Sequence, residues 1–522
     1  MADDDFLKGL PLKKGFEARG YQAHIAQNAL KTNTLVVMPT ALGKTFVAFL
    51  VMAGLLKKDP RSRFLFLAPT KPLAAQQAKR AEELLEMKGD VVLVTGEMLP
   101  EERKKVYVEA QFVSATPQCI ENDLAQRRID LSGYSLVVFD EAHRGVGDYA
   151  YVPIGAETKR KSILVLGLTA SPSSEREKIQ EVCHNLDIMQ IESRGLEDAD
   201  VAPFVKKIEF DWIFVKLPKE IIDLRGQLLL VLEESARIIT SYGFSIKAKR
   251  PNKKQLLFLR GQMLRQLPKT YKPLSELTRA INLVHAIDLL ESEGIEALLN
   301  FFEGMAGREE KSKAVERLLA DPRVDEIKVE CRSLLAVGIE HPKLEKLKQI
   351  VEEETKTGNY LIVFVHYRDS AKNVLRDLNR IKGVDARLLV GRSGDGGMKQ
   401  KEQIGMVDAF REKEFNVLVA TQVGEEGLDI PSVDAVVFYE AVPSAIRLIQ
   451  RRGRAGRVKA GRVVVLVAED TKDEAYLWIS KRKEKTMKKT LSDMQEEMAG
   501  QKQKHAETKG ARAGQREIGD FA

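Results

Sequence analysis

Short apolar runs alternate with amphipathic stretches over about residues 34–200, and the same alternation returns from about residue 345. Runs rich in Val, Leu, Ile and Phe predict strands, and the stretches between them have the spacing of helices. Strands that alternate with helices in this way indicate a doubly wound parallel sheet. The predicted strands are 34–38, 63–68, 91–94, 135–139 and 163–168 in the first region, and 361–365, 386–390, 416–420, 435–439 and 462–467 in the second.

The region between these two patterns differs in kind. Leu, Ile, Lys and Glu recur there at helical spacing, and strand signals are few after Val215, so we predict a mostly helical insertion. Beyond about residue 480 the chain is rich in Lys, Glu, Gln and Ala, which predicts a helix that frays into a disordered tail. We expect an α/β protein with parallel-sheet domains at 1–204 and 343–480, a helical insertion at 205–342 and a tail at 481–522.

Composition narrows the class of protein. A chain of 522 residues is too long for one core, and 44% hydrophobic with 30% charged residues is typical of a globular protein. No apolar run approaches the ~18 residues that cross a bilayer, and the N-terminus opens on acidic residues, so we expect a cytoplasmic protein without a membrane partner. The three cysteines lie far apart without a CxxC pair, which argues against a zinc site, and the net charge of +7 fits an anionic partner.

A strand, a short loop and an apolar helix follow one another around Gly43-Lys44-Thr45. In such a loop, backbone N–H groups surround phosphates, a lysine reaches the β- and γ-phosphates, and a hydroxyl binds Mg²⁺. An ordinary strand-to-helix turn is the alternative, but the flanking strand and helix count against it. We therefore assign the loop to ATP, with Thr45 on the metal ion; the assigned residues are Thr40, Gly43, Lys44 and Thr45.

Asp140 and Glu141 come directly after the predicted strand 135–139. The carboxyl edge of a parallel sheet is where α/β proteins bind ligands. We predict that Asp140 holds Mg²⁺ and that Glu141 orients the attacking water. Alone, an acidic pair after a strand is more often a solvated loop, but its place after the phosphate loop favours the catalytic interpretation.

The second half of the chain carries arginines and no phosphate loop of its own. Gln450 leads a glycine-punctuated run in which Arg454 and Arg457 lie three apart, on one face if the run is helical. Because arginines can reach across a cleft to a γ-phosphate, we predict that these three residues are catalytic, although a basic surface helix is the commoner fate of such runs. Thr421 and Asp429 follow a strand and are expected at the same cleft, where hydrolysis would open and close an ATP site shared by two domains.

These motifs, in this order, resemble those of superfamily 2 helicases with a DEAH box. The finer wording is similar to the archaeal Hef helicase and its Fanconi anaemia M-type relatives over about residues 10–490. The resemblance implies two RecA-like domains, ATP and Mg²⁺ as cofactors, and an ATP-dependent DNA helicase or translocase that remodels forked or branched DNA in replication and repair, in an archaeal cytoplasm. The segments that carry it include 68–73, 114–118, 139–144, 169–172 and 442–447.

Carried over position by position, the resemblance implies roles for further residues. Arg19 and Gln22 match the element that reads adenine, and Thr169 and Ser171 match the segment that couples hydrolysis to domain movement. The helical insertion resembles a polymerase thumb that favours branched DNA. The residues that match nucleic-acid contacts are Thr70, Lys71, Thr95, Gly96, Thr116, Pro117, Gly391, Arg392 and Thr421.

Two features depart from the family's pattern. Ala41 stands where the family usually has Gly, and its Cβ is expected to crowd the loop against the phosphates. The Hef pattern continues into a nuclease domain, whereas this sequence stops at Ala522 without clustered carboxylates after residue 480, so we expect remodelling of DNA without cleavage.

The insertion contains a stretch of one charge sign. From Ser235 to Ser275 there is no Asp or Glu, and ten Lys and Arg residues supply positive charge. Ordinary surfaces mix signs, so the stretch predicts neutralisation of nucleic-acid phosphates, although a solvated helix face is the alternative. The residues that we assign to DNA are Lys249, Arg250, Lys253 and Lys254. Aromatic residues at such spacing more often belong to a core, so we predict no base stacking by Phe244, Phe258 or Tyr271.

Two other functions stay open. An RNA-directed motor of the RIG-I type shares Asp-Glu boxes and a helical insertion, but no zinc-binding tail is present here. A nucleic-acid-binding scaffold with a decayed ATPase would account for Ala41, but the catalytic residues of the motifs are all retained.

The last eight residues resemble the clamp-binding peptide of replication proteins. Gln515, Ile518 and Phe521 have its three-residue spacing, and Ile518 and Phe521 would lie on one face of a helical turn. We therefore predict a sliding clamp as a partner, against the alternative of a chance match in a frayed terminus.

Overall fold

The computed structural model describes residues 2–13, 15–39, 42–170, 172–173, 175–195, 197–204, 209–246, 251–266, 271–391, 397–421, 433–440, 461–479, 482 and 485–498. These residues form two compact units. The first holds residues up to 204 together with 485–498, and the second holds 209–440 and 461–479.

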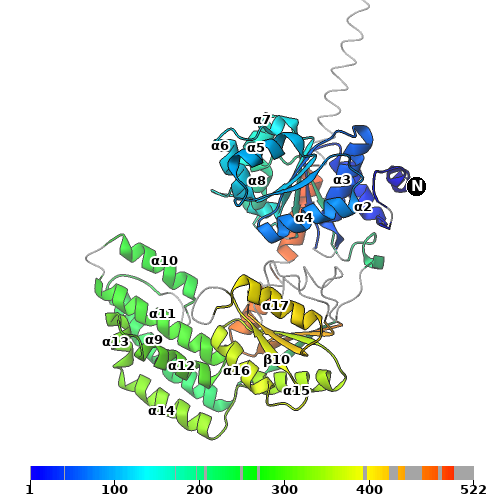
Figure 1. Ribbon diagram of the computed structural model, residues 1–522. Helices are drawn as coiled ribbons and strands as arrows, with labels where there is room; N and C mark the ends of the chain where they lie inside the picture. Colours follow the sequence, from blue (N-terminus) through cyan, green and yellow to red (C-terminus); the bar gives the residue numbers. More distant parts are fainter. Residues whose placement is uncertain are drawn as a thin grey trace, which may run out of the picture. The chain divides into compact units, whose positions relative to one another are not determined.

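The first unit is built on a parallel sheet with the order β3-β4-β2-β5-β6-β1-β7 in the described part of the chain (Figure 1). Its strands are β1 (Thr34–Val37), β2 (Phe64–Leu67), β3 (Val91–Val94), β4 (Phe112–Ala115), β5 (Leu136–Asp140), β6 (Leu164–Thr169) and β7 (Gln190–Ser193). Its helices are α1 (Ala2–Leu7), α2 (Gly20–Ala29), α3 (Lys44–Lys58), α4 (Lys71–Leu84), α5 (Pro100–Glu109), α6 (Pro117–Ala125), α7 (Tyr151–Arg160) and α8 (Arg176–Asn185), with 3-10 turns η2 (Leu131–Gly133), η3 (Ala142–Arg144) and η4 (Ala202–Phe204).

Two cores sandwich this sheet because successive side chains of a strand point to opposite faces. Val36 and Val138 pack in the core that α2, α3 and α4 cover, whereas Val37 and Val137 pack in the core beneath α6, α7 and α8. Burial on both faces explains why the sequence shows continuous apolar runs at these strands. The sequence pattern did not predict β4 or β7, and three of the four residues of β7 are polar.

The second unit contains a parallel sheet with the order β10-β11-β9-β12-β13-β8 in its described part. The strands are β8 (Glu209–Val215), β9 (Leu361–Phe364), β10 (Ala386–Leu389), β11 (Val417–Ala420), β12 (Ala435–Phe438) and β13 (Arg462–Ala468), and the helices of this domain are α15 (Pro342–Lys356), α16 (Arg368–Leu378) and α17 (Gln400–Arg411). The predicted α/β class with two doubly wound parallel sheets is confirmed.

Strand β8 belongs to the second sheet and not to the helical insertion. It pairs in parallel with β13 from Glu209 to Val215, so the start of the stretch that we assigned to the insertion is an edge strand of the second sheet. The chain reaches this edge before it enters the helices and returns to the sheet through α15. The predicted boundaries at 205 and 342 otherwise stay predictions.

The helices between β8 and α15 pack around their own apolar core, as the helical periodicity predicts (Figure 1). Leu228 and Leu232 of α9 meet Leu283 and Ile287 of α11 in this core. The helices are α9 (Lys219–Ser241), α10 (Lys253–Leu264), α11 (Tyr271–Ser292), α12 (Ile295–Ala306), α13 (Lys313–Leu319) and α14 (Pro322–Ala336). Among the described residues, no helix combines the length and the hydrophobicity needed to span a bilayer.

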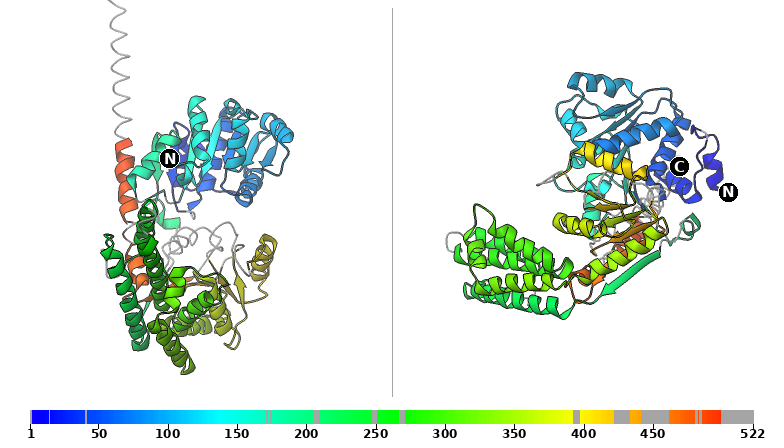
Figure 2. Two further views of the ribbon diagram at one scale, coloured as in Figure 1. Left: turned by 90° about the vertical axis from the view of Figure 1, so that its left-hand side faces the viewer. Right: turned by 60° about the horizontal axis from the view of Figure 1, so that its bottom comes forward.

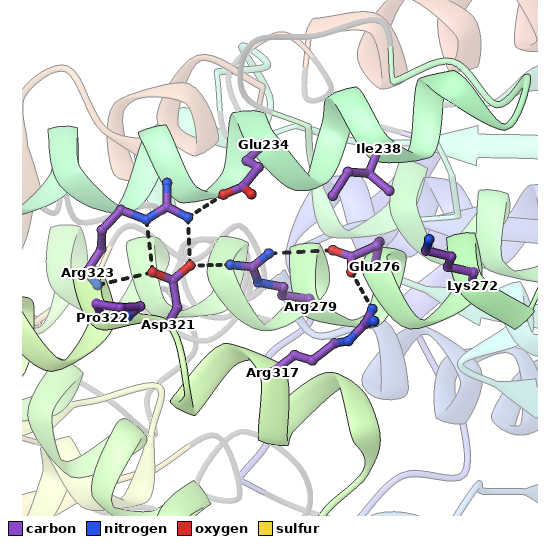
Figure 3. Close-up of a pocket in the computed structure, with 9 residues that line it drawn as sticks. All are labelled: Glu234, Ile238, Lys272, Glu276, Arg279, Arg317, Asp321, Pro322 and Arg323. Atoms are coloured by element: carbon purple, nitrogen blue, oxygen red, sulfur yellow. Dashed lines mark hydrogen bonds and ion pairs between the residues drawn. The ribbon is translucent and has the colours of Figure 1, made fainter.

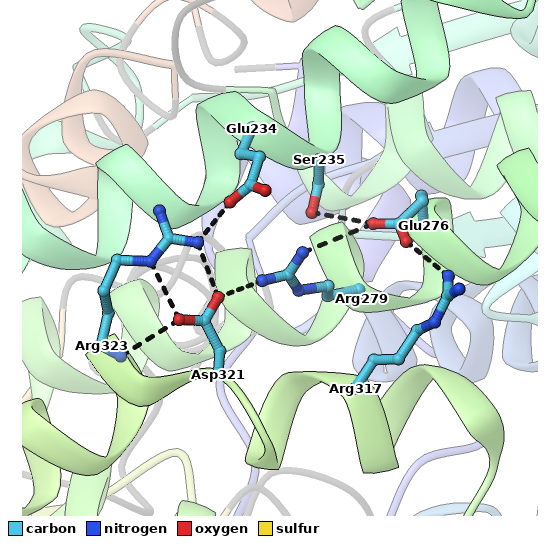
Figure 4. A network of polar contacts seen from close by, with 7 residues as sticks. All are labelled: Glu234, Ser235, Glu276, Arg279, Arg317, Asp321 and Arg323. Atoms are coloured by element: carbon cyan, nitrogen blue, oxygen red, sulfur yellow. Dashed lines mark hydrogen bonds and ion pairs between the residues drawn. The ribbon is translucent and has the colours of Figure 1, made fainter.

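An open pocket of about 560 Å³ lies between α9, α11, α13 and the start of α14 (Figure 3). Its guanidinium groups are engaged by carboxylates: buried Arg279 pairs with Glu276 and Asp321, and Arg323 bonds to Asp321 at 2.6 and 2.9 Å (Figure 4). Asp321 also caps α14 by accepting from the Arg323 backbone N–H at 3.1 Å. Arg323 also pairs with Glu234 of α9, and Arg317 of α13 pairs with Glu276. These charges hold four helices together, and we attribute the pocket to helix packing.

Replacing Asp321 by alanine is expected to destabilise the protein by about 3–5 kcal/mol, because the buried Arg279 guanidinium then loses its main carboxylate. Arg323 and Arg279 hold the pKa of the Asp321 carboxyl below its ordinary value. Its contribution to stability is therefore present above the unfolded pKa of about 4 and is lost as the pH falls through the lower folded pKa. Urea unfolding of the full chain at pH 7 measures the effect.

The matched control for this prediction is Asp325→Ala in the same helix. Asp325 is 62% exposed and pairs with Lys328, one turn further on, so its removal is expected to cost less than about 1 kcal/mol. Equal unfolding midpoints for the two variants would contradict the assigned role of the network.

Residues 485–498 form a helix that packs on the first unit (Figure 2). Met487, Leu491, Met494 and Met498 recur at the spacing of one helix face, and Leu491 and Met494 are buried in the core beneath α6, α7 and α8. Glu497 forms an ion pair of 2.5 Å with Arg176 at the start of α8. The sequence predicted a charged helix here but not its attachment to the first unit.

Candidate ATP site and nucleic-acid interface

The phosphate loop connects buried strand β1 to α3. Gly43 has a φ of +75° and precedes α3, so the backbone conformation favours glycine, and a Cβ at this position would also displace the Gln22 amide group, which lies 2.6 Å away. Lys44 is buried, and its Nζ donates to the Met38 carbonyl at 3.0 Å. Thr45 lies in the first turn of α3. Thr40 and Ala41 lie outside the described residues.

The acidic pair stands at the carboxyl end of β5, as predicted. Asp140 is 9% exposed, and burial is the main reason why its pKa is raised; the neighbouring Glu141 raises it further, while Lys44 opposes the shift. Glu141 has a left-handed backbone with a φ of +50°, an uncommon conformation for a residue other than glycine. Such strain clusters at functional sites, where it fixes the direction of a side chain.

A hydrogen bond joins the acidic box to the predicted coupling segment. His143 Nδ1 lies 3.1 Å from Thr169 Oγ1 and 3.3 Å from Glu141 Oε2. The imidazole therefore connects the end of β5 with the end of the neighbouring strand β6. Ser171, the other residue predicted for coupling, lies outside the described residues.

The predicted adenine element is joined to the phosphate loop through one carbonyl group. Gln22 Nε2 and the Tyr21 hydroxyl both donate to the Leu42 carbonyl, at 2.9 and 3.0 Å. Arg19 completes the link, because its backbone N–H donates to Gln22 Oε1 and its Nη1 to the Tyr21 hydroxyl, at 3.0 and 3.1 Å. The two ATP-binding segments predicted from the sequence thus lie side by side.

Tyr151 contributes to the site and was missed from the sequence. Its buried hydroxyl donates to the carbonyls of Asp140 and Leu67, at 2.6 and 3.2 Å, and its ring packs edge-on against Phe139. It fixes the end of β5 to the end of β2. No sequence motif surrounds Tyr151, so only the tertiary structure could identify it.

The nucleic-acid residues predicted in the first unit follow the carboxyl ends of β2, β3 and β4. Thr70 and Thr116 are the N-cap residues of α4 and α6. Pro72 and Pro117 have no N–H, and the other backbone N–H groups of these first turns lie where an anion is stabilised. Exposed Gly96 follows β3, and a Cβ there would meet nothing within 4 Å. Among the remaining predicted residues, Lys71 forms an ion pair with Glu97, and Thr95 and Pro117 are buried.

The order of the strands divides this sheet edge into two halves. The predicted ATP residues follow β1 and β5, and the predicted coupling residue ends β6; these are neighbouring strands on one side of the sheet. The predicted nucleic-acid residues follow β2, β4 and β3 on the other side. Adjacent β5 and β2 join the halves, with Tyr151 bonded to the ends of both.

The second unit places two predicted residues at the ends of paired strands. Thr421 follows β11 and is buried, and its backbone N–H donates a hydrogen bond to the Leu389 carbonyl of β10 at 3.0 Å. Gly391 follows β10, and its carbonyl accepts a hydrogen bond from Arg368 Nη2 at 2.6 Å. The sequence did not single out Arg368. Arg392, Asp429, Gln450, Arg454 and Arg457 lie outside the described residues, so their roles stay predictions.

Helix α10 carries the described part of the one-signed stretch. Lys253 and Lys254 are exposed in its first turn, while Lys249 and Arg250 lie outside the described residues. The expected burial of the aromatic residues was wrong for Phe258 and Tyr271, which are 70% and 65% exposed. Phe244 does pack partly against the helical core. The short α10 buries only Leu256 and Met263, so it leaves the Phe258 ring outside.

The described residues fit a divalent cation bound with ATP. Oxygen donors are what Mg²⁺ prefers, and the site offers the Asp140 carboxyl and the Thr45 hydroxyl. The Asp140 carboxyl is buried, and burial raises its pKa. A cation would favour the ionised carboxylate.

Comparisons with known proteins agree with this geometry. The DEAD/DEAH box helicase family matches residues 19–179, and the helicase conserved C-terminal domain family matches residues 342–459. Fold and site therefore define a DEAD/DEAH-box helicase. The chain is 42% identical to the Pyrococcus furiosus Hef helicase domain and matches its crystal structure with a TM-score of 0.73, over 88% of this chain and 98% of that one. It belongs to the Hef family of these helicases, which confirms the resemblance found in the sequence.

Three further relatives cover most of this chain. A Methanocaldococcus jannaschii protein, provisionally named an ATP-dependent RNA helicase, is 38% identical over 92% of this chain and 61% of its own length. The ATP-dependent DNA helicases mph1 of Neurospora crassa and fml1 of Schizosaccharomyces pombe are each 34% identical over 88% of this chain, and over 41% and 57% of their own lengths. The chain thus spans about 41–61% of the length of these relatives.

Proposed function

We propose that this protein is an ATP-dependent DNA helicase or translocase that remodels forked or branched DNA in replication and repair. The observation that carries the proposal is the divided edge of the first sheet, with a phosphate loop and acidic pair on one half and two helix N-termini on the other. DNA is favoured as the substrate because mph1 and fml1 are named DNA helicases.

In this proposal each residue has one task. Lys44 neutralises the β- and γ-phosphates, Glu141 orients the attacking water, and Asp140 with Thr45 holds Mg²⁺. The cation, when bound, neutralises charge that develops on the phosphate oxygens. The His143–Thr169 contact carries changes at the acidic box to β6, and Arg454 and Arg457 are proposed to reach the γ-phosphate.

ATPase assays with single-stranded, duplex, forked and four-way DNA beside matched RNA test the proposal. Stimulation by DNA, strongest with forked or four-way substrates, is the expected result. Stimulation by RNA alone would favour an RNA-directed motor. Nucleic-acid binding without hydrolysis would favour a scaffold with a decayed ATPase.

The basic face of α10 yields a separate prediction. Replacing Lys253 and Lys254 by glutamine should weaken fork binding and reduce the salt slope of log K by up to about 0.9 for each lost phosphate contact, because fewer counterions are released. Binding titrations between 50 and 200 mM salt measure the slope. ATPase activity on saturating single-stranded DNA should change little.

The control for this prediction removes the same charge elsewhere in the helical part. Arg308 and Lys313 are exposed but flank acidic Glu309 and Glu310, so their replacement by glutamine should leave the slope unchanged. An unchanged slope in the Lys253 and Lys254 variant would assign α10 to the solvated surface.

Finer parts of the proposal rest on the sequence alone. We propose a sliding clamp as a partner through Gln515, Ile518 and Phe521, which lie outside the described residues. We also propose that the protein acts in the cytoplasm of a prokaryotic cell.

A further inference from the structure

Phe204 lies against the adenine element although it is far from it in the sequence. It ends the short turn η4, and its side chain is half exposed, an unusual state for phenylalanine. The Arg19 guanidinium carbon lies 5.1 Å from the centre of its ring, and the Tyr21 ring lies 6.1 Å away at an angle of 58°. Phe204 is therefore held between two residues of the adenine element.

Arg19 is fixed from two directions. Its Nη1 donates to the Tyr21 hydroxyl at 3.1 Å, and that hydroxyl donates to Leu42 beside the phosphate loop. The cation–π contact with Phe204 adds a second constraint on the position of the guanidinium group, which a hydrogen bond to one nitrogen does not supply. The side chain is thereby oriented before any nucleotide arrives.

We propose that Phe204 is a positioning residue for the adenine base, and this rests on the proposed role of Arg19 in ATP binding. A planar guanidinium group has two faces. The Phe204 ring covers one face, and the purine of the nucleotide stacks on the other, while Gln22 hydrogen-bonds the edge of the base. Phe204 thus acts through Arg19, and it pre-organises the cation so that less side-chain entropy is lost on binding.

The position of Phe204 in the chain gives this contact a second role. It stands at the end of the first unit, a few residues before β8 of the second. Residues 198–204 are anchored by backbone bonds from Val201 and Ala202 to the Asp198 carbonyl and by the buried Val201 side chain. Binding of the base restricts Arg19, and therefore Phe204, so nucleotide occupancy is transmitted to the segment that leads into the second unit.

Phe204→Leu tests the proposal, because leucine keeps apolar bulk and removes the aromatic face. The Kd for ADP and the KM for ATP should rise about 2- to 5-fold, the range of a partly exposed cation–π contact, with little change in kcat. Phe204→Tyr should restore wild-type values. Phe214→Leu, at a half-exposed phenylalanine of β8, is the control and should leave both constants unchanged.

A double-mutant cycle separates positioning from a merely structural role. Arg19→Ala should weaken ADP binding, and Phe204→Leu should then have no further effect. Additive effects, or no effect of Phe204→Leu where Arg19→Ala has one, would overturn the proposal and leave the ATP site intact. No effect of Arg19→Ala would overturn both this inference and the proposed adenine element.

Hydrogen exchange examines the second role independently. ADP should slow exchange in residues 198–204 of the wild-type protein, and this protection should disappear in Phe204→Leu at saturating ADP. Equal protection in the two proteins would contradict transmission through Phe204.

Discussion

Replacing Lys44 by alanine is expected to reduce nucleic-acid-stimulated ATP hydrolysis at least 10²- to 10³-fold. Lys44 is buried at the start of α3, beside a glycine with positive φ, where we predict that the phosphates bind. Removal of one preorganised donor from a transition state typically has an effect of this size. Steady-state ATPase rates with saturating single-stranded DNA measure it.

Two controls make the Lys44 result specific. Lys58→Ala, at the exposed C-terminal end of the same helix, should leave turnover unchanged. DNA binding by Lys44→Ala without nucleotide should also be preserved, since the predicted nucleic-acid residues follow other strands. Near-normal hydrolysis in Lys44→Ala would remove the loop from the active site.

Glu141→Gln is expected to reduce kcat about 10²- to 10⁴-fold, the range for loss of a positioned general base. ATP binding should survive, because the amide occupies the same space and the phosphate loop is untouched. The left-handed backbone at Glu141 and the contact with His143 place the carboxylate beyond the end of β5. Single-turnover hydrolysis and nucleotide titration separate the chemical step from binding.

The matched control is Glu109→Gln, at an exposed position that ends α5, and it should hydrolyse ATP normally. A rise in KM with unchanged kcat in Glu141→Gln would mean that Glu141 binds substrate instead of activating water. The water-orienting role would then pass to another residue.

In the first sheet the sequence predicted β1, β2, β3, β5 and β6, and it missed β7 as well as β4, although β4 is buried on both faces. β1, β2 and β5 are continuous apolar runs because both sides of the sheet are covered by helices. β7 is an edge strand that contains the polar residues Gln190, Glu192 and Ser193. Its composition does not predict a strand, and its pairing with β1 holds it in the sheet. β8 showed strand character, but its partner β13 lies more than two hundred residues further along the chain.

The candidate site divides in the same way. Lys44, Asp140 and Glu141 could be predicted because phosphate chemistry requires particular residues at fixed places after strands, and their roles stay predictions. Tyr151 and Phe204 could not be predicted from the sequence. The Tyr151 hydroxyl contacts two backbone carbonyls and the Phe204 ring contacts the Arg19 guanidinium group, and both contacts arise only because distant segments pack together. Exposed Phe258 was misjudged for a related reason: burial depends on what covers a helix face, which spacing alone does not specify.

The sequence by itself determined the class of the fold and the family, and it predicted the phosphate-binding residues, because strand burial and a phosphate loop leave short local patterns. The tertiary structure alone decided the order of the strands, which places the predicted ATP residues and the predicted nucleic-acid residues on different halves of one sheet edge. It also decided that residues 485–498 pack on the first unit and that Phe204 lies beneath Arg19. These arrangements depend on contacts between segments that are far apart in the chain, which no local pattern encodes.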